Sequence, residues 1–176
     1  MLNDNLLFDQ LTPNEKSAFR GIGVKRKLDP PTRLFRFSLS EYNSPWWLSA
    51  SDLPTILVDA KHKNENLGEY IRKRTAVFKH WNIQSDLIIA ELNTPVYAFE
   101  GIIAPQQLGN RRINAEGKPL IGKYYTKSIF LRGGLRQFFI KGLEATYYKL
   151  VLPSEAIKIT DPIDVIADVL FANRLI

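Results

Sequence analysis

Leu34-Phe35-Arg36-Phe37-Ser38 is the segment from which the fold prediction starts. Its side chains alternate with a period of two, which predicts a strand with two phenylalanines on one face and Arg36 between Leu34 and Ser38 on the other. A guanidinium on an apolar strand must reach solvent, pair with a carboxylate or bind a ligand phosphate, because burying it unpaired is costly. The segment therefore predicts either a structural contact or an anion site.

Two other segments extend this prediction. Ser44-Pro45-Trp46-Trp47 follows a polar turn, and adjacent tryptophans on an extended chain point to opposite sides. Gly133-Gly134 predicts a tight turn before a strand over 136–140, with the Gln137 amide near its beginning. One tryptophan can enter the core while the other forms the wall of a cleft, or both can be core. An arginine, a serine-aromatic corner and an amide can together line a cleft for an anionic, planar ligand.

The remaining pattern predicts one α+β domain over residues 1–176. Thr12, Pro13 and Glu15 have the spacing of a helix start with a capping box. Further helices are expected from about residue 51, over 67–81 and after 160–162, and strands over 33–38, 86–92, 95–103, 136–140 and 146–152. Helices thus dominate the first half and strands the second, apart from one early strand and the last helix, which is an α+β arrangement.

The order of these features resembles the ADP-ribosyltransferase fold of bacterial toxins. The resemblance implies a split antiparallel β-sheet that binds NAD. It implies that Arg36 anchors NAD, that Ser44 with Trp46 or Trp47 braces the nicotinamide side, and that Gln137 lies on the catalytic strand. The complete predicted cofactor-binding set is Arg36, Phe37, Ser44, Trp46, Trp47 and Tyr97.

One position departs from the catalytic motif of that family. The motif is Gln-x-Glu or Glu-x-Glu, whereas Phe139 stands two residues after Gln137. A glutamine amide can orient a substrate through hydrogen bonds but cannot act as a base. Either Gln137 acts through its amide, or Glu100 or Glu144 supplies the carboxylate. The predicted catalytic residues are Gln137, Arg36 and Glu100.

The positive charge favours a nucleic acid as the acceptor of ADP-ribose. Lys and Arg number 24 against 18 Asp and Glu, a formal net charge of +6. The predicted substrate-binding residues for RNA or DNA are Lys25, Arg26, Arg111 and Arg112, because such clusters can follow phosphates. A solvated surface explains the same clusters. Protein is the second acceptor class, and the resemblance also implies a neutralising antitoxin or immunity protein.

The composition bears on compartment and metal chemistry. With no cysteine and only His62 and His80, we expect neither a disulfide scaffold nor a metal site. The sequence shows no apolar run long enough for a membrane span and no basic segment leading into an apolar stretch near Met1. We therefore expect a cytoplasmic protein with no membrane partner.

Two functions of other classes stay open. Asp59 and Lys61 have the Asp-x-Lys spacing with which some nucleases hold a magnesium ion and a catalytic lysine, although here the pair falls on a predicted helix. The chain can also be a non-catalytic basic domain that binds RNA or a partner protein. NAD-dependent thermal protection, magnesium-dependent cleavage and salt-sensitive binding distinguish the three.

Overall fold

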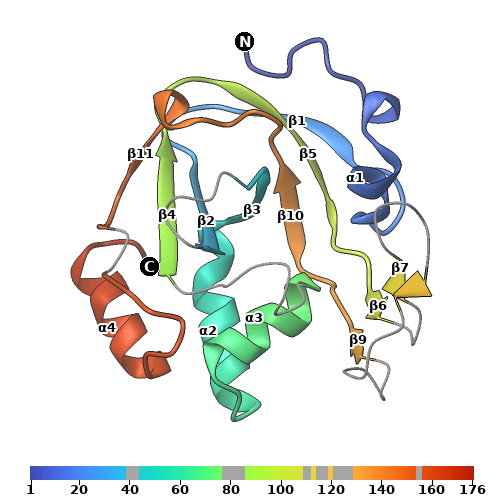
Figure 1. Ribbon diagram of the computed structural model, residues 1–176. Coiled ribbons are helices and arrows are strands. Elements are labelled where there is room, and N and C mark those ends of the chain that lie inside the picture. Colours follow the sequence, from blue (N-terminus) through green and yellow to red (C-terminus); the bar gives the residue numbers. More distant parts are fainter. Residues whose placement is uncertain (39–43, 77–85, 109–111, 114–118, 121–128, 154–155) are drawn as a thin grey trace.

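The computed structural model describes residues 1–176 except 39–43, 77–85, 109–111, 114–118, 121–128 and 154–155 (Figure 1). Seven antiparallel strands form the main sheet, in the order β1-β5-β10-β3-β2-β4-β11. Their bounds are β1 Val24–Leu28, β2 Arg33–Ser38, β3 Trp46–Ser49, β4 Asp86–Leu92, β5 Val96–Ile102, β10 Arg136–Phe139 and β11 Tyr148–Leu150. Two small sheets pair β6 (Gln106–Leu108) with β9 (Ile129–Leu131) and β7 (Arg112–Ile113) with β8 (Pro119–Leu120).

The main sheet divides at its central strand. Trp46 and Trp47 of β3 pair with β10, whereas Leu48 and Ser49 pair with β2. Each half of β3 therefore hydrogen-bonds to a different neighbour, which separates β1-β5-β10 from β2-β4-β11. Side chains from both groups of strands meet in one apolar cluster, called here the inner core. Its buried members are Leu34, Trp47, Ile88, Ala90, Leu92, Val96, Ala98, Phe138, Ile140 and Leu143.

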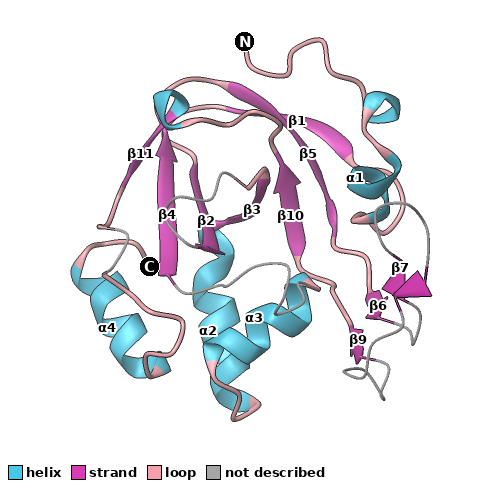
Figure 2. Ribbon diagram, viewed as in Figure 1, coloured by secondary structure: helices cyan, strands magenta, loops and turns pink. Residues whose placement is uncertain are grey.

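Helices and the N-terminal segment cover the faces of the strands that point away from the inner core (Figure 2). The helices α2 (Leu53–His62), α3 (Leu67–Thr75) and α4 (Ile163–Ala172) share a second cluster with Phe35 and Phe37 of β2. The elements η1 (Phe8–Gln10) and α1 (Pro13–Ser17) lie beside a third cluster, in which Phe8 and Phe19 pack on β5 and β10. The remaining short helices are η2 (Ala50–Asp52) and η3 (Ala145–Tyr147). Within the described ranges, no helix has the length and apolar character needed to cross a membrane.

Local sequence rules explain the helix ends. The predicted capping box of α1 is confirmed, since Glu15 N donates to Thr12 Oγ1 at 3.3 Å and Thr12 N donates to Glu15 Oε2 at 2.7 Å. The predicted helix over 67–81 is wrong in length, because α3 ends at Thr75. Ala76 has a φ of 52°, a left-handed conformation that terminates a helix. The rest of the predicted range lies outside the described residues.

Glu91 joins three strands through two ion pairs and gives a first testable expectation. Its Oε1 lies 2.8 Å from Lys149 Nζ, and its Oε2 lies 2.8 Å from Arg33 Nε. The hydrogen bonds from Lys149 and Arg33 hold the pKa of Glu91 below its usual 4.5. A carboxyl group whose folded pKa is lowered contributes stability that is complete above the unfolded pKa and is lost as the pH falls through the folded one.

Glu91→Gln should therefore flatten the acid limb of the stability profile. We expect the thermal midpoint of the unaltered chain to fall more steeply than that of the variant between about pH 5 and about pH 3. Thermal unfolding followed by circular dichroism across that range measures both curves. Parallel curves would show that the two cations do not stabilise the ionised form of Glu91.

Candidate functional site

Arg36 lies at the centre of the candidate site. Arg36 belongs to the six-residue strand β2 and is 6% exposed, although its side chain carries a positive charge. Its Nη1 donates to the carbonyl oxygen of Ser44 at 2.6 Å, and its Cζ lies 4.3 Å from the centroid of the Trp47 ring. The hydrogen bond and the stacking on an aromatic face offset part of the cost of burying the guanidinium. The arginine of β2 and the serine-aromatic segment before and in β3 are thus in direct contact.

Trp47 adds a buried donor to this place. Its side chain is 1% exposed, and within the described part of the chain its indole N–H meets no hydrogen-bond acceptor. A buried tryptophan usually finds such an acceptor, because an unsatisfied donor costs free energy. The prediction that the two tryptophans point to opposite sides is confirmed: Trp47 packs in the inner core, and Trp46 packs on Phe139 with ring centroids 4.6 Å apart.

Gln137 does not face Arg36. In β10, Phe138 pairs with Trp47 and shares the inner core, so the alternation of the strand turns its neighbour Gln137 to the opposite face. There Gln137 is 5% exposed, and its Nε2 donates to the carbonyl oxygen of Ala18 at 3.0 Å. The expectation that Arg36 and Gln137 lie across one groove is therefore wrong. The physical reason is the register of β10 on β3.

Glu100 lies on the same side of the sheet as the inner core, because it pairs with Phe138 across β5 and β10. Its Oε2 lies 2.9 Å from Arg26 Nε, and its Oε1 lies 3.4 Å from Arg136 Nη1. Arg136 also reaches Asp52, with Nη2 3.1 Å from Oδ1. The carboxylate is therefore held between two arginines of neighbouring strands. Glu144, the other carboxylate considered, is exposed and immediately precedes η3.

The structure scatters the other predicted cofactor-binding residues. Phe37 is 4% exposed and packs with the helices, on the face of β2 opposite to Arg36. Tyr97 lies at the start of β5 under Lys25, whose Nζ is 4.8 Å from the ring centroid. Ser44 stays with Arg36, and its Oγ accepts from Trp46 N at 3.3 Å. Only Arg36, Ser44 and Trp47 of the predicted set are brought together.

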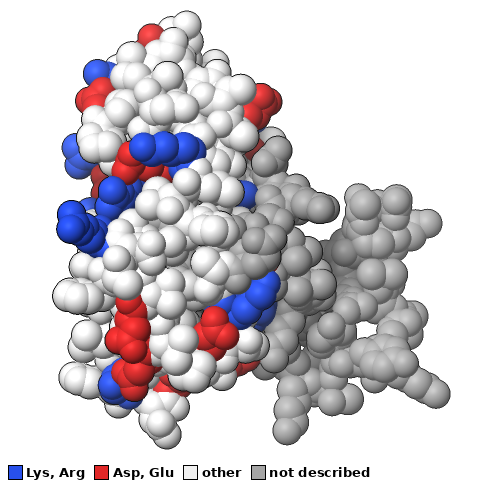
Figure 3. Space-filling model, turned by 90° about the vertical axis from the view of Figure 1, so that its left-hand side faces the viewer, with Lys and Arg blue, Asp and Glu red and all other residues white. Residues whose placement is uncertain are grey.

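The residues predicted to bind the acceptor lie on the edge strand β1, in the short strand β7 or outside the described residues. Lys25 and Arg26 are on β1, an edge strand, where Lys25 donates to the carbonyl of Asp4 and Arg26 pairs with Glu100. Arg112 begins β7, and Arg111 lies outside the described residues. Figure 3 shows the side that carries β11 and α4, where cationic and anionic residues are interspersed.

Asp59 and Lys61 do not form a common site. Both lie on α2, as expected, but Asp59 accepts from the Tyr70 hydroxyl at 3.1 Å while Lys61 pairs with Asp164 of α4 at 2.5 Å. Burial and the hydrogen bond to Asp59 raise the pKa of Tyr70. Among the described residues, no three His, Asp or Glu side chains gather where a metal ion could bind.

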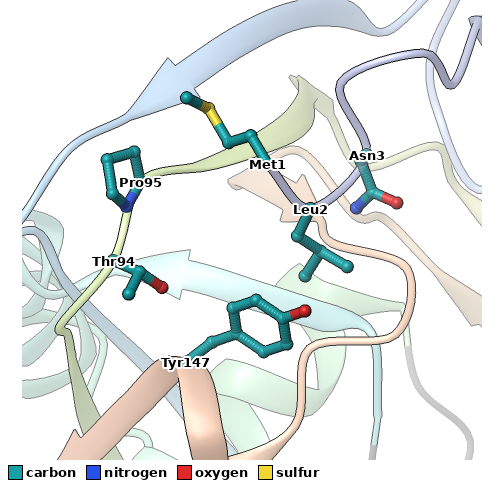
Figure 4. Close-up of a pocket in the computed structure, with 6 residues that line it drawn as sticks. All are labelled: Met1, Leu2, Asn3, Thr94, Pro95 and Tyr147. Carbon is teal, nitrogen blue, oxygen red and sulfur yellow. The ribbon is translucent and has the colours of Figure 1, made fainter.

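A shallow cavity of about 590 Å³ opens beside the turn that follows β4. It is lined by Met1, Leu2, Asn3, Thr94, Pro95 and Tyr147 (Figure 4). Thr94 and Pro95 belong to the turn after Leu92, whereas Arg36 pairs with Ile88 in the first half of β4. This cavity is therefore not part of the Arg36 site.

One buried acid beside Arg36 was missed by sequence reasoning. Asp86, the first residue of β4, is 7% exposed. Its position before an apolar run is typical of an ordinary strand end, and its ion-pair partner Lys158 is 72 residues away. No local pattern could have revealed it.

Comparisons with known proteins give a limited result. No protein-family model and no curated protein matches the chain. Its structure is similar to that of Rhs1-CT, solved in complex with its cognate immunity protein RhsI1. The TM-score is 0.47 and the sequence identity 13%, over 77% of this chain and 81% of that chain.

Proposed function

We propose that this chain is an NAD-dependent mono-ADP-ribosyltransferase toxin, which transfers ADP-ribose to an intracellular macromolecule, preferably RNA or DNA. The observation that carries the proposal is the central strand order β10-β3-β2. The resemblance assigns a catalytic strand, a serine-aromatic strand and an arginine strand to one NAD site. The three segments assigned to those roles are neighbours here, and the sheet splits at the middle one.

The residues around Arg36 fit an anionic, planar ligand. The guanidinium is held by Ser44 and Trp47 in a fixed orientation, so little conformational entropy remains to be lost when it binds a phosphate. The indole N–H of Trp47 can donate to a ligand oxygen, which would satisfy a donor that the described residues leave unpaired. Arg36 and Trp47 would hold NAD. When bound, NAD supplies a ribose carbon activated by its bond to nicotinamide.

Gln137 has a supporting role in this proposal. Its amide binds Ala18 on the face away from Arg36, so it fixes the N-terminal segment against β10. Glu100 lies on the inner-core side of the sheet, as Arg36 does, which is where the proposal needs a carboxylate that acts on ribose. Its two arginine partners hold it in place and compete with a ribose hydroxyl for its oxygens.

The preference for a nucleic acid as the acceptor of ADP-ribose rests on the net charge of the chain and is part of the proposal. A net charge of +6 attracts polyanions and raises the rate of encounter with nucleic acid. A toxin that modifies an intracellular target also requires a neutralising partner in the cell that makes it. We include an immunity protein or antitoxin as that partner.

The test is to follow the ADP-ribose group directly. The protein is incubated with NAD labelled in its adenylate phosphate and with separate RNA, DNA and protein fractions, which are then separated from free nucleotide. We expect label in a nucleic acid fraction and an NAD-dependent rise in the thermal midpoint of the enzyme. Label in no fraction, together with an unchanged midpoint at millimolar NAD, would refute the proposal.

A non-catalytic basic domain is the second candidate function. It is favoured by the separation of Gln137 from Arg36 and by the contacts that already surround the guanidinium. It predicts salt-sensitive binding to RNA or a partner without any effect of NAD. The nuclease alternative is not favoured, since Asp59 and Lys61 contact different elements.

A further inference from the structure

The buried polar residues of the described chain are few. Arg36, Asp86 and Gln137 are the polar or charged side chains classed with the core, at 6%, 7% and 5% exposure. Gln137 lies on the other face of the sheet, which leaves Arg36 and Asp86 as two buried ionic groups to be explained together. Because a desolvated charge is expensive to maintain, a buried carboxylate beside a buried guanidinium is a candidate for function.

Strand register places Asp86 next to Arg36. On β4 the inner-core residues Ile88, Ala90 and Leu92 alternate with residues that face the helices, so Asp86 falls on the inner-core side. Arg36 pairs directly with Ile88, two residues after Asp86. Diagonal neighbours of this kind on antiparallel strands are roughly 7–8 Å apart, with their Cβ atoms somewhat closer, which is within reach of a long side chain. Register and burial thus bring the two buried ionic residues to neighbouring positions on one face of the sheet.

The ion-pair partner of Asp86 is Lys158, which follows β11 in the sequence. Lys158 Nζ lies 2.6 Å from Asp86 Oδ1, and the lysine side chain is 45% exposed while that of Asp86 is 9% exposed. A backbone bond from Leu87 N to Ile157 O at 2.9 Å already fixes the same segment to β4. The ion pair is therefore not needed to attach this segment to β4, because the backbone hydrogen bond already does so. Its additional effect is to hold Asp86 in one orientation.

We propose that Asp86 is the carboxylate of the Arg36 site and that Lys158 positions it. This inference rests on the proposed function and changes one part of it, because Glu100 then serves only as the partner of Arg26 and Arg136. Arg36 binds a phosphate of NAD, and Asp86 accepts a hydrogen bond from a ribose hydroxyl. A fixed anion in a water-poor place stabilises the positive charge that develops on the ribose.

The transfer of ADP-ribose is chemically balanced with NAD and the acceptor as its only reactants. The bond between C1′ of the ribose and the nicotinamide nitrogen breaks and its electron pair leaves on nicotinamide, while an acceptor oxygen or nitrogen bonds to C1′ and its proton passes to solvent. Asp86 neither gains nor loses a covalent bond in this step. Asp86 stabilises the transition state more than the bound substrate, because the positive charge on the ribose develops only there, so its loss should lower kcat far more than it weakens NAD binding.

The experiment compares the two members of the ion pair. Asp86→Asn should lower label transfer at saturating NAD by about 100-fold, while the NAD-dependent rise in thermal midpoint is kept. Lys158→Gln should lower the thermal midpoint by a similar amount to Asp86→Asn but reduce transfer by less than about 5-fold, because the carboxylate remains. Asp164→Asn, in the exposed pair with Lys61, is the matched control and should transfer like the unaltered chain.

The outcomes separate this inference from the function on which it rests. Equal losses of transfer in Asp86→Asn and Lys158→Gln, in proportion to their losses of stability, would show a structural tether and overturn the role of Asp86. Transfer by Asp86→Asn within about 5-fold of the unaltered chain would overturn it too. An unaltered chain that neither transfers label nor responds to NAD refutes the proposed function itself, whatever the variants do.

Discussion

Arg36→Lys should lower NAD-dependent label transfer by about 100-fold, since it keeps the positive charge and removes the planar fork. The guanidinium of Arg36 stacks on Trp47 with its Cζ 4.3 Å from the ring centroid and donates to Ser44 at 2.6 Å. A lysine ammonium is a compact, strongly hydrated point charge that cannot stack and bind a phosphate bidentately at once. Initial rates of label transfer at several NAD concentrations measure the effect, and we expect both KM and kcat to change.

Stability has to be measured beside activity, because Arg36 is a buried residue. Loss of the stacking contact and of the hydrogen bond should cost about 1–2 kcal/mol in the free energy of unfolding, which urea titration can resolve. Arg33→Lys is a matched control on the same strand, since Arg33 is 40% exposed and pairs with Glu91. It should transfer label at the normal rate. A folded Arg36→Lys variant that does the same would remove Arg36 from the reaction.

The sequence predicts the elements better than it predicts their mutual orientation. Alternation over residues 33–38 correctly predicts β2 and the face on which Arg36 lies, because a period of two needs no tertiary information. The side of the sheet to which Gln137 points depends instead on strand register, because Phe138 pairs with Trp47. A shift of one residue in that register would turn Gln137 to the inner-core side. Residue order alone cannot decide between the two registers.

Long-range contacts explain the other differences. Lys158 reaches Asp86 across 72 residues, and the switch of β3 from β10 to β2 depends on the packing of two groups of strands. Neither has a local signal, whereas the capping box of α1 is a local hydrogen-bond pattern and was predicted correctly. The candidate site is therefore only partly visible in the sequence. Arg36, Ser44 and Trp47 could be identified from their own segments, and Asp86 could not.

Gly133→Ala should destabilise the chain by about 2–4 kcal/mol, the largest stability effect we expect from a single methyl group. Gly133 has a φ of +62°, and a Cβ there would lie 2.6 Å from Ile103 O and 2.7 Å from Ala104 O. The clash is with backbone atoms of the two residues that follow β5, which cannot rotate away as a side chain can. Left-handed strain for alanine adds about 1 kcal/mol.

The turn at Gly133 also positions β10. Gly133 N donates to Lys73 O at the end of α3, and Gly134 N donates to Ile103 O, both at 3.0 Å. Gly21→Ala is the matched control, because Gly21 has a φ of +91° but nothing within 4 Å of an added Cβ. It should cost only about 1 kcal/mol. Urea titrations of the two variants separate backbone strain from collision. Equal midpoints would show that the carbonyls of Ile103 and Ala104 move aside freely and that the predicted collision does not occur.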